Sequence, residues 1–260
     1  MNNMFYTKKS LGQHFLINEF VIHKIIAAAG NLTNKTVIEI GPGNLALTQQ
    51  LVKQAKCVFA IEKDKRLTAK LEDFKAKYSN FNYAIADSLT YEDNLSGTKV
   101  LVSNLPYNIG TQIFLNYLFK AKQSNFEYFI LMFQKEVALR ITATVGSKSY
   151  GRLSIIAQLL SVTELLFDVD KNNFSPAPKV QSSVIKVTPL ITPKFEVDID
   201  KLSYVTNLAF QGKRKTLRNS LKKLNINLED LGIDSTKRAE ELFLEEFCKI
   251  ANSIQSIQKN

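Results

Sequence analysis

Short apolar runs recur along the first half of the chain, and the stretches between them carry apolar residues at helical spacing. The runs cover 36–40, 57–61, 83–86, 100–102 and 126–133. Runs of this length suit strands that are buried on both faces of a parallel sheet. The intervening segments that favour helices are 18–30, 45–53, 64–77 and 111–119. Because strands alternate with helices, we predict βαβ units and an α/β fold with a parallel sheet.

The pattern changes after residue 134. Apolar residues at helical spacing predict two further helices, over 135–144 and 152–161. Period-two alternation then predicts an antiparallel pair of strands, over 163–169 and 182–187. The segment between these strands contains Pro176 and Pro178, which impose a stiff and extended loop.

The last part of the chain carries only helical signals. Pro189 and Pro193 bracket a linker, and helical stripes follow from Asp200 onward. We therefore predict two domains: a sheet-containing domain over 1–190 and a small, all-helical C-terminal domain over 191–260.

The composition restricts the partners and the compartment. The 260 residues carry a formal net charge of +10, and the pI is about 9.4, which favours nucleic acid as a partner over a membrane surface. Cys57 and Cys248 provide neither a disulfide framework nor a metal-ligand spacing, so we expect a reducing compartment, the cytoplasm, and no metal. The polar N-terminus does not resemble a signal peptide, and the longest apolar run, 129–133, is too short to span a bilayer.

A glycine turn follows the first predicted strand. The residues Glu39-Ile40-Gly41-Pro42-Gly43 make a tight turn against which a nucleoside can lie, and the loose dinucleotide fingerprint G-x-G-x-x-A also fits. Glu62 ends the next strand, where a carboxylate can hold ribose hydroxyls, and Asp87 ends the third, where it can accept from an adenine amino group. Carboxylates at three successive strand ends suit a ligand with several donors and a cationic amino acid moiety, such as S-adenosylmethionine. Two alternatives are a nicotinamide dehydrogenase and strand ends that are merely solvated.

The fourth predicted strand ends in Asn104-Leu105-Pro106-Tyr107. Pro106 stops the strand at the edge of the sheet where ligands bind in α/β folds. The Asn104 side chain and the peptide at Leu105-Pro106 offer carbonyl acceptors for the two N–H bonds of an exocyclic purine amine, which would free its lone pair for attack. Tyr107 can stack on the base. The alternative is an ordinary exit from a strand into a loop.

With these features, the chain resembles the ribosomal RNA adenine N6-dimethyltransferases, most closely the KsgA (RsmA) family. The matching motifs span residues 8 to 187 in order. They are Gln13-His14-Phe15-Leu16, Glu39-Ile40-Gly41-Pro42-Gly43, Ile61-Glu62, Asn104-Leu105-Pro106-Tyr107-Asn108, Gln134-Lys135-Glu136-Val137, Tyr150-Gly151-Arg152-Leu153-Ser154 and Phe174-x-Pro176-x-Pro178-Lys179-Val180-x-Ser182. Together they are highly specific.

The resemblance implies a Rossmann-like S-adenosylmethionine-dependent methyltransferase with a small helical C-terminal domain. It implies transfer of methyl groups to N6 of two adjacent adenosines near the 3′ end of 16S rRNA, in the immature small ribosomal subunit. Such a reaction needs no metal and depends mostly on positioning. We expect a monomer that acts in the cytoplasm.

The resemblance also implies roles for particular residues. The residues expected to bind the methyl donor or line its pocket are His14, Leu16, Gly41, Glu62, Asp87 and Asn104. The residues expected to hold the target amine and base are Asn104, Leu105, Pro106, Tyr107 and Phe174. Phe174 has an alternative role as a loop anchor in the core. Two positions depart from the family pattern: His14 stands where many relatives have Asn, and Leu45 where a glycine is frequent.

Basic residues cluster in the C-terminal domain. Six of them lie within eleven residues without an acidic neighbour: Lys213, Arg214, Lys215, Arg218, Lys222 and Lys223. This density suits a surface that contacts phosphates, although it also fits a solvated helix face. Further candidates for RNA contact are Lys8, Lys9, Lys148 and Arg152.

Two other functions remain open at this stage. One is a resistance-type enzyme that methylates a single adenosine of large-subunit rRNA by the same chemistry. The other is a ribosome-assembly or transcription factor that keeps the fold and binds nucleic acid without methylating it. The intact glycine turn and Asn-Leu-Pro-Tyr motif argue against a loss of activity.

Overall fold

The computed structural model describes residues 13–92, 94–212 and 214–255, and the chain divides into two compact units. The first unit comprises the chain up to Ala138 together with Thr163–Pro189, and the second comprises Leu139–Val162 and the chain from Leu190. The break between the units after Pro189 therefore coincides with the expected domain boundary near residue 190. The segment 139–162, which the sequence analysis assigns to the first domain, groups with the second unit.

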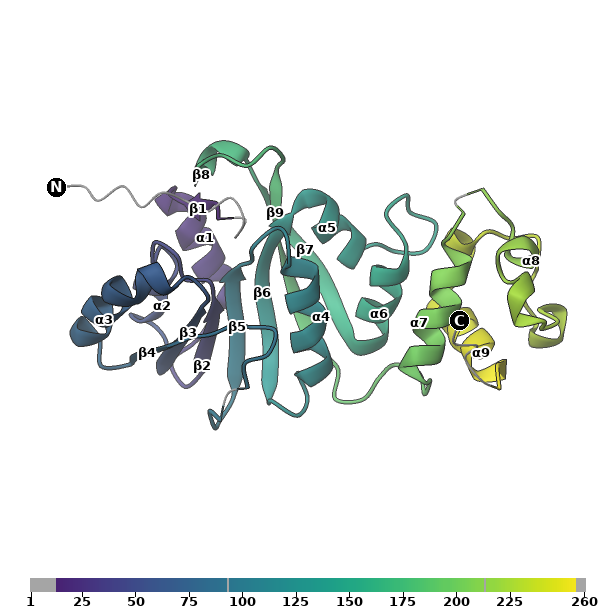
Figure 1. Cartoon of the computed structure of the whole chain (residues 1–260), viewed down its shortest axis with the longest axis horizontal. Coiled ribbons are helices and arrows are strands. Elements are labelled where there is room, and N and C mark those ends of the chain that lie inside the picture. Colours follow the sequence, from purple (N-terminus) through teal and green to yellow (C-terminus); the bar gives the residue numbers. More distant parts are fainter. Residues whose placement is uncertain (1–12, 93, 213, 256–260) are drawn as a thin grey trace. The chain divides into compact units, whose positions relative to one another are not determined.

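A seven-stranded sheet runs through the first unit in the order β4-β3-β2-β5-β6-β9-β7 (Figure 1). The first five strands are parallel, and β9 is antiparallel to β6. The bounds are β4 Phe81–Ile85, β3 Cys57–Glu62, β2 Thr36–Ile40, β5 Lys99–Asn104, β6 Phe126–Gln134, β9 Ser182–Pro189 and β7 Ser161–Val169. The predicted parallel sheet is confirmed. The direction in which strands are added reverses between β2 and β5, and ligands bind α/β sheets at such a point.

The helices of this part of the chain are α1 Glu19–Ala29, α2 Thr48–Leu51, α3 Thr68–Lys77, α4 Gly110–Lys120 and α5 Lys135–Ile141. The side chain of Asn18 caps α1 by accepting from the amides of Phe20 and Val21. The helix predicted over 45–53 is wrong in extent, because only α2 is helical there. Leu45 has a φ of 70°, which a right-handed helix cannot contain.

Helix α4 packs on one face of the sheet, beside β5 and β6 (Figure 1). Phe114 of α4 meets Phe133 of β6 edge-on, with 6.0 Å between ring centroids. Phe114 and Phe129 are fully buried. Each such side chain contributes about 1.5–3 kcal/mol from burial alone. This packing fixes the position of the chain on both sides of the 104–109 turn.

A separate two-stranded sheet lies outside the main one. Strand β1 (Phe15–Leu16) pairs antiparallel with β8 (Phe174–Ser175). The sequence analysis predicts no element before the helix over 18–30, so this strand was missed. It brings the start of the described chain to the proline-rich loop.

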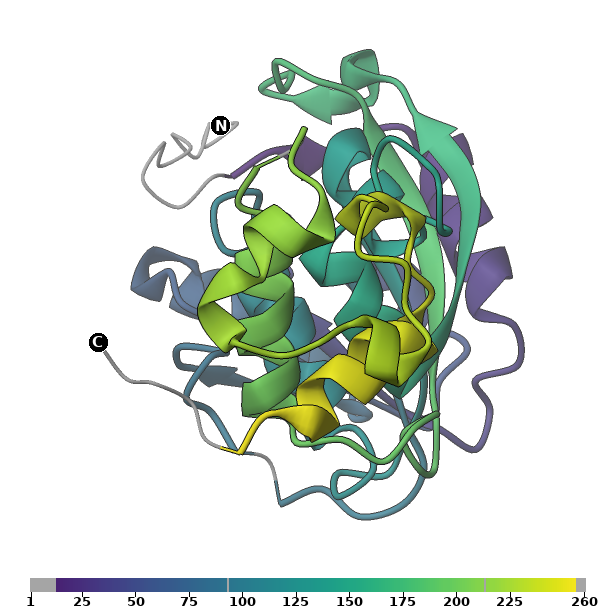
Figure 2. The same cartoon turned by 90° about the vertical axis from the view of Figure 1, so that its right-hand side faces the viewer.

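From Leu190 onward, the described residues of the second unit are helical, as predicted for 191–260, apart from connecting loops and an isolated bridge between Thr216 and Arg238. Its helices are α6 Arg152–Leu160, α7 Ile199–Ala209, α8 Leu217–Ser220 and α9 Leu244–Ser253. Helices α7 and α9 pack together, as Figure 2 shows in green and yellow. The rings of Phe210 and Phe247 stack at 5.7 Å in this core. Among the residues that the structure describes, no helix is both long and apolar enough to cross a membrane.

Candidate active site

A cavity opens at the carboxyl ends of the parallel strands, where the strand order reverses. Five segments provide most of its lining: 13–16, the glycine turn 39–44, 61–63, 86–88 and 104–109. These segments contain every residue expected to bind the methyl donor. Strand ends that lie up to 65 residues apart in the chain are thus brought together by the parallel topology.

The glycine turn has the backbone conformation that its sequence requires. Gly41 and Gly43 have φ values of 66° and 53°, in the left-handed region that favours glycine. At Gly43 a Cβ would also lie 2.7 Å from the ring of Phe15. Leu45 has a positive φ as well, a conformation that favours the glycine expected at this position from the resemblance.

Glu62 is buried at the end of β3, and its carboxylate is held by backbone amides. Its Oε1 accepts from the amide of Asp64 at 2.8 Å, and its Oε2 accepts from that of Gly43 at 3.4 Å. Burial raises the pKa of this carboxyl above its ordinary value. The amides fix the orientation of the carboxylate and leave lone pairs for ribose hydroxyls.

Glu39 forms a second buried carboxyl in the cavity wall. The Thr48 hydroxyl donates to its Oε2 at 2.7 Å. Burial, together with the nearby Glu62 carboxylate, raises the pKa of Glu39 to about 8, so this carboxyl is largely neutral at pH 7.

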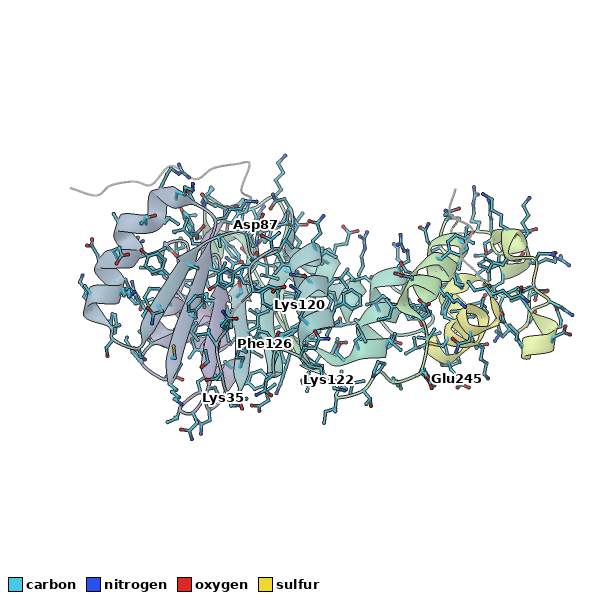
Figure 3. The ribbon with its side chains drawn as sticks, turned by 60° about the horizontal axis from the view of Figure 1, so that its bottom comes forward. Lys35, Asp87, Lys120, Lys122, Phe126 and Glu245 are labelled. Atoms are coloured by element: carbon cyan, nitrogen blue, oxygen red, sulfur yellow. The ribbon has the colours of Figure 1, made fainter. Side chains whose placement is uncertain are left out.

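Asp87 follows β4 and lies at the end of the sheet where the cavity opens. Figure 3 shows that Lys35, which precedes β2, lies at the opposite end of the sheet. Lys63 donates to Oδ2 of Asp87 at 2.6 Å, and the amide of Leu89 donates to its Oδ1 at 3.0 Å. The Lys63 ammonium holds the pKa of this carboxyl below its ordinary value. Lys63 also lines the cavity. Sequence reasoning missed it, although its position next to Glu62 was a signal.

The side chain of Asn104 is oriented by a single contact across the cavity. Its Nδ2 donates to the backbone carbonyl of His14 at 3.0 Å. Because a carbonyl can only accept, this contact assigns the amide nitrogen and leaves Oδ1 as the group that can accept from a ligand. Beside it, the Ser103 hydroxyl donates to the carbonyl of Ile40 at 2.6 Å and ties the end of β5 to that of β2.

Tyr107 is held at both its ring and its hydroxyl. Its ring stacks on that of His14, with 5.1 Å between centroids, and its hydroxyl pairs with the Ser182 hydroxyl at 2.5 Å. His14 in turn donates from Nδ1 to the carbonyl of Pro176 at 2.8 Å. Leu105 is buried, and Pro106 follows it in the cavity wall.

The segment 13–16 lies along the cavity and is bound by several loops. Gln13 donates to Asp64, and Asn44 donates to the carbonyl of Leu16. Leu16 itself is buried but contributes to the lining. Asn44 and Asp64 are thus residues that sequence reasoning missed, and their only signal was their place directly after the glycine turn and Glu62.

Phe174 lies elsewhere. It is 3% exposed, packs in the core with Leu16 and Val169, and is absent from the cavity lining. This position corresponds to its alternative role as a loop anchor, and the observed side chain does not reach a base in the cavity. In the described part of the chain, no three His, Cys, Asp or Glu side chains group closely enough to hold a metal ion.

Two kinds of comparison by sequence point to one family. The family model described as "Ribosomal RNA adenine dimethylase" matches residues 4–256. A "Ribosomal RNA small subunit methyltransferase A" of Bartonella bacilliformis is 46% identical over 253 residues, covering 94% of this chain and 91% of that protein. The protein of that name from Wolbachia sp. subsp. Drosophila simulans is 42% identical over 262 residues, covering 96% and 94%.

Solved structures agree with the fold. A dimethyladenosine transferase from Plasmodium falciparum superposes with a TM-score of 0.79 at 28% identity, covering 91% of this chain and 96% of that one. The 23S rRNA methyltransferase ErmE superposes with a TM-score of 0.70 at 24% identity, which shows a shared fold. The cavity, the family match and these relatives together establish that the chain belongs to the ribosomal RNA adenine dimethylase family.

Proposed function

We propose that this protein transfers methyl groups from S-adenosylmethionine to N6 of two adjacent adenosines near the 3′ end of 16S rRNA. The product is N6,N6-dimethyladenosine, formed while the small subunit matures. The observation that carries the proposal is the orientation of Asn104, whose Oδ1 is left to accept beside the glycine turn and Glu62. We further propose that the protein acts as a monomer in the cytoplasm.

The residues of the cavity fit the methyl donor. We assign the ribose hydroxyls to the Glu62 carboxylate, which two amides hold, and the adenine amino group to Asp87, which also lines the cavity. The buried Glu39 carboxyl lies in the same wall, and a cationic amino acid moiety bound beside it would favour its ionised form and pair with it. When bound, the donor supplies an electrophilic methyl group on a sulfonium, which needs no acid to activate it.

The chain's own part in the reaction is to hold the target amine. Oδ1 of Asn104 and a backbone carbonyl at Leu105-Pro106 accept hydrogen bonds from the two N–H groups of this amine. These bonds draw the nitrogen toward a tetrahedral shape. Positioning of this kind contributes a large share of the barrier reduction in reactions between two bound molecules. As the N–C bond forms, the C–S bond of the donor breaks and a neutral thioether leaves. The methylated nitrogen then carries a positive charge and loses one proton to water, so no general base is required.

The target adenine must leave its stack to reach the cavity, which costs a few kcal/mol. Tyr107 offers an aromatic face that offsets part of this cost by stacking. Phe174, buried in this structure, would have to move before it could contact the same base.

Positively charged residues provide the surface for the RNA backbone. Arg214, Lys215, Arg218, Lys222 and Lys223 are exposed in the second unit, as are Lys148 and Arg152. Lys8, Lys9 and Lys213 lie outside the described residues. Exposed cations at this density suit phosphate contacts.

Methyl-labelled S-adenosylmethionine tests the proposal when it is incubated with the protein and either purified ribosomal subunit. We expect label in small-subunit rRNA with the wild-type protein and none with Asn104→Ala, whose affinity for the donor stays within about tenfold because its cavity is otherwise intact. Label in the large subunit would instead support the single-adenosine enzyme, whose relative ErmE shares the fold. Binding to the subunit without any label would support an assembly factor.

A further inference from the structure

The motif Phe174-x-Pro176-x-Pro178-Lys179-Val180-x-Ser182 ends in a serine whose role the proposed function does not explain. Ser182 is the first residue of β9 and is completely buried. Its hydroxyl pairs with that of Tyr107 at 2.5 Å, across 75 residues of sequence. A buried hydroxyl requires such a partner, and here the partner is the residue that is expected to stack on the target base.

The backbone around Ser182 is fixed from both sides. Ser182 is paired with Gln134 of β6, and the amide of Lys135 donates to the carbonyl of Gln181 at 2.9 Å. The neighbouring Ser183 donates to Asp168 at 2.6 Å. The Ser182 hydroxyl is therefore a fixed point, whereas Tyr107 lies in the loop between β5 and α4.

The two contacts of Tyr107 restrict different motions. The His14 ring stacks on one face of the phenol ring, so a base that stacks on Tyr107 must take the opposite face. The bond to Ser182 at the far end of the ring opposes rotation about the Cα–Cβ bond, which would swing the hydroxyl away from Ser182. A side chain that must meet a flipped base gains from such support, because a displacement of about 1 Å can cost a large factor in rate.

We propose that Ser182 is a positioning residue for the methyl transfer, which fixes the Tyr107 ring in the orientation that receives the target adenine. The expected effect on the methylation rate rests on the proposed function. Its structural part, the restraint on Tyr107, stands independently of the substrate.

Kinetics of small-subunit methylation test the proposal with three variants. Ser182→Ala and Tyr107→Phe each remove the hydroxyl pair, so each should lower kcat by about tenfold and leave the donor Kd within about twofold. The double variant should be no slower than the slower single variant, because both changes remove the same bond. Ser182→Thr, which keeps a hydroxyl, should recover much of the rate.

Ser183→Ala is the matched control. It also removes a buried hydroxyl from β9, but that hydroxyl bonds to Asp168 and not to Tyr107. We expect it to lower thermal stability as much as Ser182→Ala while keeping a wild-type kcat. Equal kcat losses in both serine variants, or independent losses that multiply in the Tyr107→Phe/Ser182→Ala protein, would overturn the proposal.

A readout without catalysis separates this proposal from the proposed function. With 3-fluorotyrosine placed at position 107, the ¹⁹F NMR signal should change in shift and width in Ser182→Ala and stay unchanged in Ser183→Ala. An unchanged signal in Ser182→Ala would refute the restraint even if the wild-type protein methylates rRNA. A changed signal in a protein that methylates neither subunit would leave the restraint standing and refute the proposed function.

Discussion

The side-chain amide of Asn104 donates to the backbone carbonyl of His14 at 3.0 Å, and this bond joins the end of β5 to the N-terminal strand β1. It connects residues 90 positions apart in the chain and decides which atom of the amide faces the cavity. The same residue thus orients the start of the described chain and keeps Oδ1 as the acceptor that the proposed function assigns to the target amine.

Asn104→Asp separates these two properties. The aspartate keeps an acceptor but cannot donate to the His14 carbonyl, and its charge lies against that oxygen. We expect the methylation rate to fall by at least about 100-fold, because the carboxylate turns away from the carbonyl and the target amine loses its acceptor. Initial rates and donor calorimetry measure this effect. A variant that methylates at a rate close to wild type would show that the bond to His14 does not orient residue 104.

Gly43→Ala tests the close approach of the N-terminal strand to the glycine turn. The new Cβ would lie 2.7 Å from the Phe15 ring, and the φ of 53° is strained for alanine. We expect donor affinity to fall by about tenfold or more, and Phe15→Leu in the same chain to restore part of it. Calorimetry with S-adenosylmethionine checks both proteins.

Gly30→Ala is the control for this change. Gly30 has a φ of 66° but no atom within 4 Å of a built Cβ, and it lies at the end of α1. The free energy of unfolding of the Gly30→Ala protein should therefore fall by about 1 kcal/mol, and its affinity for the donor should stay unchanged. Equal donor affinity in the two alanine variants would contradict the role of the contact with Phe15.

Glu39 makes stability depend on pH in a defined direction. Burial raises its folded pKa from 4.5 to about 8, so the folded state keeps a proton that the unfolded state loses. This contribution to stability is fully present below about pH 4.5 and is lost as pH rises toward 8, at up to about 1.4 kcal/mol per pH unit.

Glu39→Gln removes this ionisation and keeps the shape of the side chain. Its Tm relative to the wild type should rise steadily between about pH 5 and pH 8. Thermal unfolding of both proteins across this range measures the difference. A Tm difference that does not change with pH would mean that Glu39 titrates normally in the folded protein.

The basic surface of the second unit predicts steep salt dependence. If exposed cations contact phosphates, the affinity for small-subunit rRNA falls linearly with salt on logarithmic axes, and each lost contact lowers the slope by about 1. Lys222→Ala with Lys223→Ala should lower the slope and leave the donor affinity unchanged. A matched change of Lys75 and Lys77, which lie on α3, serves as the comparison. Equal salt-dependence slopes in both double variants would show that Lys222 and Lys223 do not contact the RNA.

The part of the site that depends on local sequence pattern could be predicted from the sequence. Glu62, Asp87 and Asn104 each end a predicted strand, and parallel strands necessarily bring such ends to one edge. The positive φ of Gly41 and Gly43 follows equally from the tight turn that their spacing indicates.

Contacts across long stretches of the chain could not be predicted in this way. The pairing of β1 with β8 and the contact of Asn104 with His14 depend on tertiary packing that no local pattern encodes. The ion pair between Lys63 and Asp87 was missed for the same reason, whereas the burial of Phe174 fits the loop-anchor role that the sequence analysis kept as an alternative. The helix expected over 45–53 failed because Leu45 adopts a left-handed conformation that its own side chain disfavours.

The account is tested most directly by mass spectrometry of 16S rRNA from unmethylated small subunits incubated with the protein and S-adenosylmethionine. It predicts two adjacent N6,N6-dimethyladenosines near the 3′ end with the wild-type protein, and unmodified adenosines with an Asn104→Ala variant that still binds the donor. Dimethylation by that variant, or a wild-type protein that leaves both adenosines unmodified, would contradict it.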